Sequence, residues 1–283
     1  MQVRRNVALA AFSSMGIGGD AAYLTVVNTI SDLKKAILFA GLRHLRYKIV
    51  GNGSNCLFAD TGFLGLIIVC RVAYCRIWQE RVFVGAGYKL PQLVRKTLAS
   101  GLGGLEFAGG IPATCGGAIY MNCGAYGLQM ADVVEKVSFM DPDGQIRLLD
   151  KDNLDFAYRS SCFNGMPGAI LGAVLALRRD RFAKLHSKEY MQRRLAAQPV
   201  KDKSLGSVFR NPEGCSAGAL IDSCGLKGRQ IGGAAVSAKH ANFIVNSGGA
   251  TAKDVRELIN IIKAAVLQKH GLVLQEEIEA FGE

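Results

Sequence analysis

The chain has 283 residues, 49% hydrophobic and 20% charged, which is enough for two globular domains with substantial cores. Its net charge of +11 is dispersed and accompanies no nucleic-acid-binding motif, so we expect it to attract anionic small molecules rather than nucleic acid. No apolar run reaches the roughly eighteen residues that a membrane span needs, and none follows the basic residues of Met1–Arg5, so we expect a cytoplasmic protein without membrane association.

The first 180 residues predict an alternation of strands and helices. Pro91 lies in the first turn of a predicted helix that ends at Gly101, and Ser31 is expected to cap an earlier helix. The turn signal of Asp141–Gly144 predicts a hairpin. The expected helices are 31–40 and 91–99, and the expected strands are 46–50, 64–70, 81–85, 134–140, 145–149 and 169–177.

The composition changes after residue 178, where charged residues become frequent up to residue 203. We therefore predict an N-terminal domain over 1–180, in subdomains of about 1–60 and 61–180, and a smaller domain over 181–283. Thr251 is expected to cap the last helix, with Asp254 near the positive end of its dipole. The expected helices are 184–197, 217–224 and 251–269, and the expected strands are 241–245 and 272–279.

Two glycine-rich segments are the most informative features of the sequence. Gly103–Gly127 is dense in glycine and almost uncharged, and Gly51–Asn55 directly follows a predicted strand. Such segments turn sharply and present main-chain N–H groups, which is how proteins bind diphosphates without many side chains. Taken singly, the first is also compatible with a glycine-rich loop against the core, and the second with an ordinary turn.

Together these segments resemble the FAD-binding half of the UDP-N-acetylenolpyruvoylglucosamine reductase family. The resemblance covers roughly residues 6 to 282, because further motifs follow in the family order. These motifs are Tyr158–Phe163, Gly206–Pro212, Gly225–Gly228 leading to Ser237–Asn246, and Leu274–Ile278. The implied fold is α+β, with an FAD domain of the vanillyl-alcohol-oxidase (PCMH) type followed by a smaller substrate-binding domain.

The resemblance implies non-covalent FAD, with NADPH as co-substrate. It implies reduction of UDP-N-acetylglucosamine enolpyruvate to UDP-N-acetylmuramate for peptidoglycan synthesis, and hence for cell-wall growth, shape and division. The residues that it assigns to FAD are Gly51, Asn52, Gly53, Ser54, Asn55, Gly109, Gly110, Ile111, Pro112, Ala113, Thr114, Gly116, Gly117, Ala118, Asn122 and Gly124. Ala113 stands where the family commonly has glycine, and Leu205 where a smaller residue is usual.

In the implied reaction, a hydride passes from NADPH to FAD and from flavin N5 to substrate C3, and C2 then takes a proton. The resemblance assigns the proton to Ser207, and Arg159 and Glu277 to the substrate carboxylate side. Arginine can bind a carboxylate through two parallel bonds. Glu276 is the alternative to Glu277, because strand alternation separates their side chains and the family has proline before its catalytic glutamate.

Asn211 and Lys227 are the expected substrate contacts, and Lys227 could meet the UDP phosphates. The roles of His240 and Tyr126 stay open between ligand contact and structure. The chain resembles the shorter family type without a tyrosine-bearing lid loop, so no lid residue is assigned. We expect a monomer. We also expect no metal, because the eight cysteines show no metal-ligand spacing.

Two other flavin or nucleotide functions compete with the reductase. Another FAD-dependent oxidase of the same superfamily would explain the first half of the chain, and a non-catalytic UDP-sugar-binding protein would explain the fold.

The Gly-x-Ser-x-Gly sequence at Gly214–Gly218 also matches a hydrolase signature. Pro212 rules out the central strand that this signature needs, so we expect Ser216 to cap the next helix.

Overall fold

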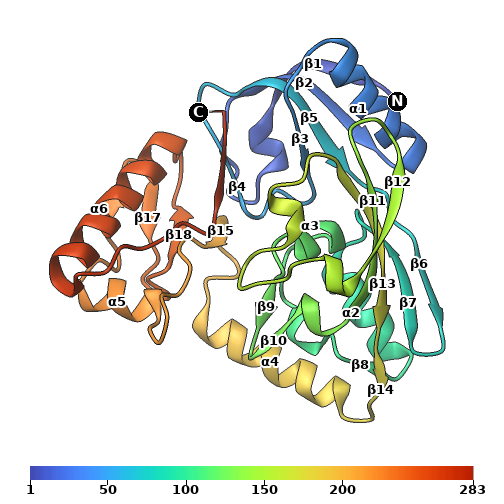
Figure 1. The fold of residues 1–283 in the computed structure, drawn as a ribbon. Coiled ribbons are helices and arrows are strands. Elements are labelled where there is room, and N and C mark those ends of the chain that lie inside the picture. The colour runs from blue at the N-terminus through green and yellow to red at the C-terminus, as the bar shows by residue number, and fades with distance from the viewer. Residues whose placement is uncertain (283) are drawn as a thin grey trace. The chain divides into compact units, whose positions relative to one another are not determined.

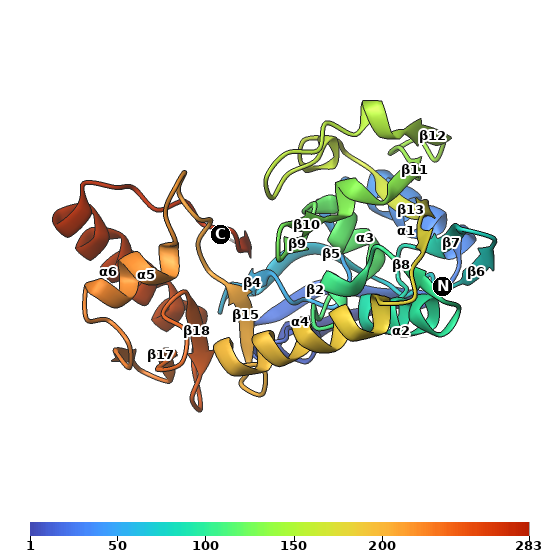
Figure 2. The ribbon, with the colours of Figure 1, turned by 90° about the horizontal axis from the view of Figure 1, so that it is seen from below.

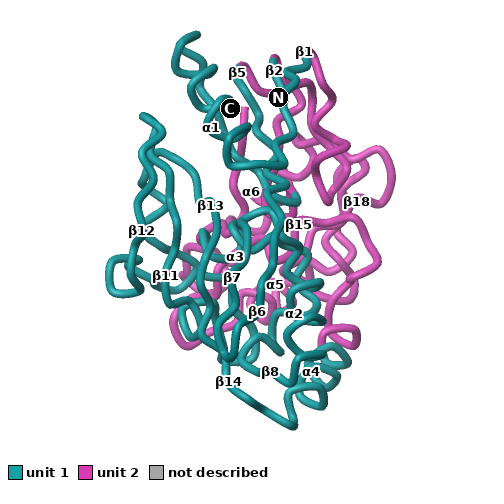
Figure 3. Tube along the Cα trace, turned by 90° about the vertical axis from the view of Figure 1, so that its right-hand side faces the viewer, with its two compact units in different colours: residues 1–4, 23–52, 65–193 teal, residues 5–22, 53–64, 194–283 magenta. Residues whose placement is uncertain are grey.

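A computed structural model describes residues 1–282 and divides the chain into two compact units (Figures 1 and 3). Unit 1 consists of residues 1–4, 23–52 and 65–193, and unit 2 consists of residues 5–22, 53–64 and the chain from 194 onward. The expected division at residue 180 therefore differs from these units. Unit 2 includes N-terminal segments because Cys56–Phe58 (β4) pairs in parallel with Glu279–Phe281 (β19), a long-range contact without a local sequence signal.

Unit 1 is built around a five-stranded sheet in the order β12-β11-β13-β7-β6. The predicted hairpin and buried strand are confirmed here, because β11 pairs with both β12 and β13 in antiparallel register. The strands are β6 (Cys75–Trp78), β7 (Arg81–Gly85), β11 (Val134–Met140), β12 (Ile146–Asp150) and β13 (Ala169–Ala176). Two small pairs join β8 (Leu102–Gly103) to β14 (Arg178–Arg179), and β9 (Gly124–Ala125) to β10 (Leu128–Gln129).

Helices α2 (Leu90–Ala99) and α3 (Cys115–Tyr120) lie on one face of this sheet (Figure 2). Leu93 of α2 and Ile119 of α3 share a buried cluster with Val84 of β7 and Leu175 of β13. The apolar face of α2 and the alternation of the strands supply this core. The glycine-rich segment forms α3 and the turns around it, so this core holds it from one side.

A second sheet has the order β1-β2-β5-β3, and its strands β1, β2 and β5 pass from one unit into the other. Its strands are β1 (Val3–Ala8), β2 (Asp20–Val27), β3 (Tyr47–Val50) and β5 (Phe63–Cys70). Helix α1 (Ile30–Leu42) packs Leu33 and Ile37 against Leu66 of β5. The expected cap at Ser31 is wrong, because the Thr29 hydroxyl accepts the Asp32 N–H at 3.1 Å and the helix begins one residue earlier.

Unit 2 contains a sheet in the order β15-β18-β17-β16, against which α5 and α6 pack (Figure 1). Its strands are β15 (Ser204–Ser207), β16 (Gln230–Ile231), β17 (Ala234–Val236) and β18 (Phe243–Asn246), and its helices are α5 (Ala217–Ser223) and α6 (Ala252–His270). Thr251 caps α6 together with Asp254, as predicted. Helix α4 (Ala183–Ala197) contains the passage from unit 1 into unit 2.

The expected strand over 272–279 is wrong in extent. Only β19 is a strand at this end of the described chain, and Glu276 forms an isolated bridge with Phe209. Short 3-10 helices complete the described chain at Leu9–Phe12, Glu106–Ala108, Met130–Asp132, Lys151–Asn153 and Cys162–Asn164. None of the helices within residues 1–282 is long and apolar enough to cross a membrane.

Candidate flavin and substrate site

The loop after β3 begins in unit 1 with Gly51 and Asn52. The Arg71 guanidinium donates to the Gly51 carbonyl at 2.6 Å, and the Asn52 amide donates to the Pro112 carbonyl at 2.9 Å. A Cβ atom on Gly51 would lie 2.2 Å from the Thr114 hydroxyl oxygen, so only glycine allows this approach. The two glycine-rich segments therefore meet at Asn52–Pro112 and Gly51–Thr114.

The same loop continues in unit 2 with Gly53, Ser54 and Asn55. Gly53 has φ +61°, and a Cβ atom on it would lie 1.8 Å from the Phe12 carbonyl oxygen. Within the described chain, none of the main-chain N–H groups of residues 51–55 donates a hydrogen bond. Loops that leave successive N–H groups available are suited to anionic oxygens.

Residues 109–118 form the turn that leads into α3. The Thr114 hydroxyl caps the helix by accepting the Gly117 N–H at 3.4 Å. Gly116 donates its N–H to the Ala86 carbonyl, and a Cβ atom on it would lie 2.8 Å from the Ala86 Cβ. On Gly117 a Cβ atom would meet only the Thr114 hydroxyl, at 3.6 Å, so its Cα has open space beside it.

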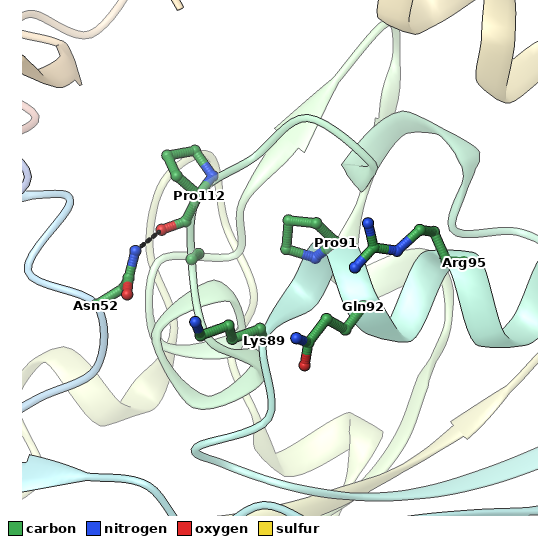
Figure 4. A pocket seen from close by; sticks show the side chains of 7 residues that line it. Asn52, Lys89, Pro91, Gln92, Arg95 and Pro112 are labelled. Atoms are coloured by element: carbon green, nitrogen blue, oxygen red, sulfur yellow. Dashed lines mark hydrogen bonds between the residues drawn. The ribbon is translucent and has the colours of Figure 1, made fainter. Parts of the chain in front are cut away.

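A pocket of about 330 Å³ opens beside this turn (Figure 4). Sequence reasoning assigned Asn52, Pro112 and Ala113 to the cofactor and missed the α2 side of the pocket. The Ala113 methyl lines the pocket and leaves it open, so this departure from glycine is accommodated. The pocket is lined by Asn52, Lys89, Pro91, Gln92, Arg95, Pro112 and Ala113.

The residues on the α2 side of the pocket have only a weak signal in the sequence. Lys89 and Arg95 bracket the first turns of α2, next to Pro91 and Gln92. Two cations and an amide beside a glycine-rich turn suit the phosphates of a dinucleotide. The donors available in loop 51–55, the glycine-limited approach at Gly51 and this cationic pocket together fit FAD.

Asn122 and Gly124 have mainly structural contacts. Asn122 is fully buried, and its side-chain amide donates to Gln129 at 3.0 Å and to the Ala157 carbonyl at 2.9 Å. Its oxygen accepts the Ala131 N–H at 2.9 Å. Since these bonds occupy the side chain, any cofactor contact of Asn122 would come from its main chain. Gly124 pairs with Gln129 in the β9–β10 hairpin.

Arg159 lies in unit 1, in a loop with a left-handed backbone of φ 56°. Its guanidinium donates to the Gly124 carbonyl at 3.2 Å and lies over the Tyr158 ring, 5.1 Å from its centroid. A non-glycine residue in this conformation is strained, and such strain is concentrated at functional sites. These contacts link Arg159 to the glycine-rich segment.

Tyr126 belongs to the same part of unit 1. Its ring stacks on that of Tyr190 in α4 at 4.5 Å, and its hydroxyl donates to the Tyr190 carbonyl at 2.9 Å. About 38% of Tyr126 stays exposed, so the ring has a structural contact and an accessible surface.

Main-chain hydrogen bonding in unit 2 brings Glu277 next to the segment that contains Ser207. Ser207 ends β15 opposite Phe243, after Gly206 with φ +78°. The Glu277 N–H donates to the carbonyl of Val208 at 2.8 Å, and the Asn55 amide donates to the Glu277 carbonyl at 3.0 Å. The loop assigned to the cofactor therefore contacts the main chain of the proposed carboxylate residue within unit 2.

The two adjacent glutamates have different surroundings. The Glu276 carboxylate forms ion pairs with Arg256 at 2.8 Å and with Lys263, both on α6. Glu276 is thereby committed to fixing the C-terminal segment on the helix. Alternation in extended chain around the Phe209–Glu276 bridge predicts the opposite side for the Glu277 side chain, and Glu277 stays the proposed functional carboxylate.

The expected substrate contacts are also in unit 2. The Asn211 oxygen accepts the Ala217 N–H at 3.0 Å, and Lys227 forms an exposed ion pair with Asp222 at 2.6 Å. His240 accepts the Asn242 N–H through Nδ1 at 3.3 Å, and burial lowers its pKa. His240 is therefore a neutral, half-buried side chain with a structural hydrogen bond.

The structure also describes Ser216 and the cysteines. The Ser216 hydroxyl caps α5 by accepting the Ala219 N–H at 3.3 Å, as predicted. Cys115 is buried, and burial raises the pKa of its thiol, whereas Cys123 and Cys162 are only half-buried. In the described part of the chain, no group of three or more His, Cys, Asp and Glu residues could hold a metal ion.

Comparisons with known proteins agree with this geometry. Residues 198–281 match the family model described as UDP-N-acetylenolpyruvoylglucosamine reductase, C-terminal domain, and residues 21–150 match an FAD binding domain. The UDP-N-acetylenolpyruvoylglucosamine reductase of Protochlamydia amoebophila is 44% identical over 98% of this chain and 93% of the relative. The one from Chlamydia pneumoniae is 40% identical over 98% and 91%.

Solved structures give the same result at the level of the fold. The UDP-N-acetylenolpyruvylglucosamine reductase of Thermus caldophilus matches over 100% of both chains, with a TM-score of 0.85 and 37% identity. The 6-hydroxy-D-nicotine oxidase of Arthrobacter nicotinovorans matches 63% of this chain and 42% of its own, with a TM-score of 0.51 and 18% identity. The latter likeness concerns the fold alone.

Proposed function

This chain belongs to the family of UDP-N-acetylenolpyruvoylglucosamine reductases, FAD-dependent oxidoreductases of peptidoglycan precursor synthesis, and we propose on that premise that it reduces UDP-N-acetylglucosamine enolpyruvate to UDP-N-acetylmuramate with NADPH. The observation that carries the proposal is the 44% identity to a relative of that name over 98% of the chain. The glycine-limited contact between the loop at Gly51 and the turn at Thr114 supports the cofactor part independently.

The proposed cofactor site consists of the loop 51–55, the turn 109–118 and the main chain at Asn122 and Gly124. Bound FAD would supply hydride chemistry, from NADPH to C3 of the enolpyruvyl group. The N–H groups of loop 51–55 would hold anionic oxygens of the cofactor. Lys89 and Arg95 would add two positive charges beside the turn.

Ser207 is proposed to donate the proton that C2 takes. A serine hydroxyl has a high pKa, so it donates only to a strongly basic centre that is held close to it. Gly206, with φ +78°, shapes the turn that carries Ser207. The pairing of Ser207 with Phe243 holds the main chain of the donor in the sheet of unit 2.

Arg159 and Glu277 are proposed to act at the carboxylate side of the substrate. A guanidinium there would stabilise the charge that develops on the carboxylate and C2. The bond from Arg159 to the Gly124 carbonyl and its position over Tyr158 support a fixed orientation. Glu277 would orient the enol-like substrate, and Asn211 and Lys227 would contact the UDP-sugar.

An absorption experiment tests the function. The purified protein would be examined under anaerobic conditions, before and after NADPH and then after UDP-N-acetylglucosamine enolpyruvate. We expect a flavin band that NADPH bleaches and the enolpyruvyl compound restores. A flavin that stays reduced would contradict the proposal in favour of an oxidase, and a protein without flavin would favour a UDP-sugar-binding protein. The cytoplasmic location and the monomeric state stay predictions, which fractionation and gel filtration would test.

A further inference from the structure

Arg210 is a cation in unit 2 for which neither the sequence motifs nor the comparisons give a role. It lies between Phe209 and Asn211, in the segment that carries Ser207. Its main-chain N–H donates to the Gln275 carbonyl at 2.9 Å, on one side of the Phe209–Glu276 bridge. The Glu277 N–H donates to the Val208 carbonyl on the other side of that bridge. Arg210 is thereby fixed in the same local pairing as Glu277.

The pairing also places Arg210 and Glu277 next to the Phe209–Glu276 bridge. Residues two apart on a strand project to the same side, as do residues that lie opposite each other in an antiparallel pair. Phe209 and Glu276 project toward the core of unit 2 and α6, where Glu276 meets Arg256 and Lys263. Arg210 and Glu277 each follow a bridged residue in the chain.

The guanidinium of Arg210 has an unusual environment. Its Nε is buried without a hydrogen-bond partner in the described chain, while the residue as a whole is half-buried. Removing a charged donor from water without a partner is costly, and such groups are rare in folded proteins. A ligand oxygen that accepts the Nε–H would offset this cost in free energy.

Three other cations of unit 2 have carboxylate partners. Lys227 is paired with Asp222, and Arg256 and Lys263 are paired with Glu276. Arg210 differs from these three by its unpaired Nε and by its place three residues after Ser207.

We propose that Arg210 binds an anionic oxygen of the substrate through its buried Nε–H. This inference rests on the proposed function, since UDP-N-acetylglucosamine enolpyruvate has two anionic groups, the diphosphate and the enolpyruvyl carboxylate. Both groups present pairs of anionic oxygens, which a guanidinium binds well.

The test compares Arg210→Met, which removes the charge at similar length, with Arg210→Lys, which keeps the charge without an Nε–H. We expect the KM for the enolpyruvyl substrate to rise roughly tenfold to a hundredfold in the Met variant and by a smaller factor in the Lys variant. The control is Lys201→Met, which removes one charge from an exposed side chain of unit 2 and should leave KM unchanged.

A binding measurement distinguishes the two anions. UDP-N-acetylglucosamine has the diphosphate but no enolpyruvyl carboxylate. A rise in its Kd in the Met variant, measured by calorimetry, would assign Arg210 to the diphosphate, and an unchanged Kd beside a raised KM would assign it to the carboxylate. A KM within twofold of wild type in the folded Met variant would overturn the inference.

Thermal stability separates binding from a structural role. Because the Arg210 Nε has no partner to lose, the Met variant should melt at the wild-type temperature or above it. A lower melting temperature with a wild-type KM would mean that Arg210 is structural. A wild-type protein that does not reduce the enolpyruvyl compound would contradict the proposed function itself, which is a different outcome from an unchanged variant.

Discussion

At the scale of single residues, the site depends on side chains whose roles are set by their immediate contacts. The Ser207→Ala variant should block proton delivery to C2 while leaving flavin reduction by NADPH at the wild-type rate. The reason is that the hydroxyl is needed only in the second half of the reaction. Stopped-flow absorption of each half-reaction would check this, and a normal reoxidation rate in the variant would exclude Ser207 as the donor.

Glu276 and Glu277 offer a matched pair of substitutions. Glu276→Gln should leave turnover largely intact but lower the free energy of unfolding by on the order of 1 kcal/mol, because it weakens two partly exposed ion pairs. Glu277→Gln should lower kcat at least tenfold with a smaller effect on stability. Urea unfolding and steady-state rates on both variants would test this, and the reverse pattern would transfer the catalytic role to Glu276.

His240 predicts a pH dependence of stability. Burial lowers its folded-state pKa below the ordinary 6.5, so the unfolded chain binds the proton first as the pH falls. Above pH 6.5 both states are neutral, and below it the wild type should lose stability progressively. His240→Asn keeps an acceptor for the Asn242 N–H and does not titrate, so the gap between the two melting temperatures should change from pH 7 to pH 5. A constant gap would contradict this.

Some of this residue-level detail was accessible from the sequence, and some was not. Alternation predicts opposite sides for the Glu276 and Glu277 side chains, because the period of two is a property of extended chain. Arg210 was missed because nothing local reveals that a side chain lacks an acceptor. Lys89 and Arg95 were missed because their shared pocket depends on how α2 approaches the turn at Pro112.

At the scale of elements, α6 is the best-specified helix of unit 2. The Thr251 hydroxyl accepts the Asp254 N–H at 3.1 Å, and the Asp254 carboxylate accepts the Thr251 N–H at 2.9 Å. Thr251→Ala should therefore lower the free energy of unfolding by about 1 kcal/mol. Urea unfolding would measure it, with the exposed Gln268→Ala in the same helix as the control. Equal stability of the two variants would contradict the capping role.

The accuracy of the element predictions follows the range of the forces involved. Helix α6 and the hairpin at Asp141–Gly144 were predicted because caps and turn residues act locally. The prediction of a strand over 272–279 was wrong because a strand forms only where a partner strand lies beside it. The partner of this end of the chain, β4, reaches only Glu279–Phe281, and it lies more than 200 positions earlier in the sequence.

At the scale of the whole molecule, the chain crosses between its compact units at 4/5, 22/23, 52/53, 64/65 and 193/194. A fragment that starts at residue 181 would lack the segments 5–22 and 53–64, and hence β4. We expect such a fragment to be largely unfolded by circular dichroism. Adding a peptide with residues 53–64 should not restore it, because 5–22 is still missing. A cooperative melt of the fragment alone would contradict this.

The ion pairs of Glu276 also couple helix α6 to Glu277. Glu276 is tied to Arg256 and Lys263, which lie about two turns apart on the helix. The next residue in the chain is Glu277, so a ligand that shifts Glu277 moves the anchor of the helix as well. Amide hydrogen exchange along α6 should therefore slow when the site is filled, although the helix itself takes no part in the chemistry.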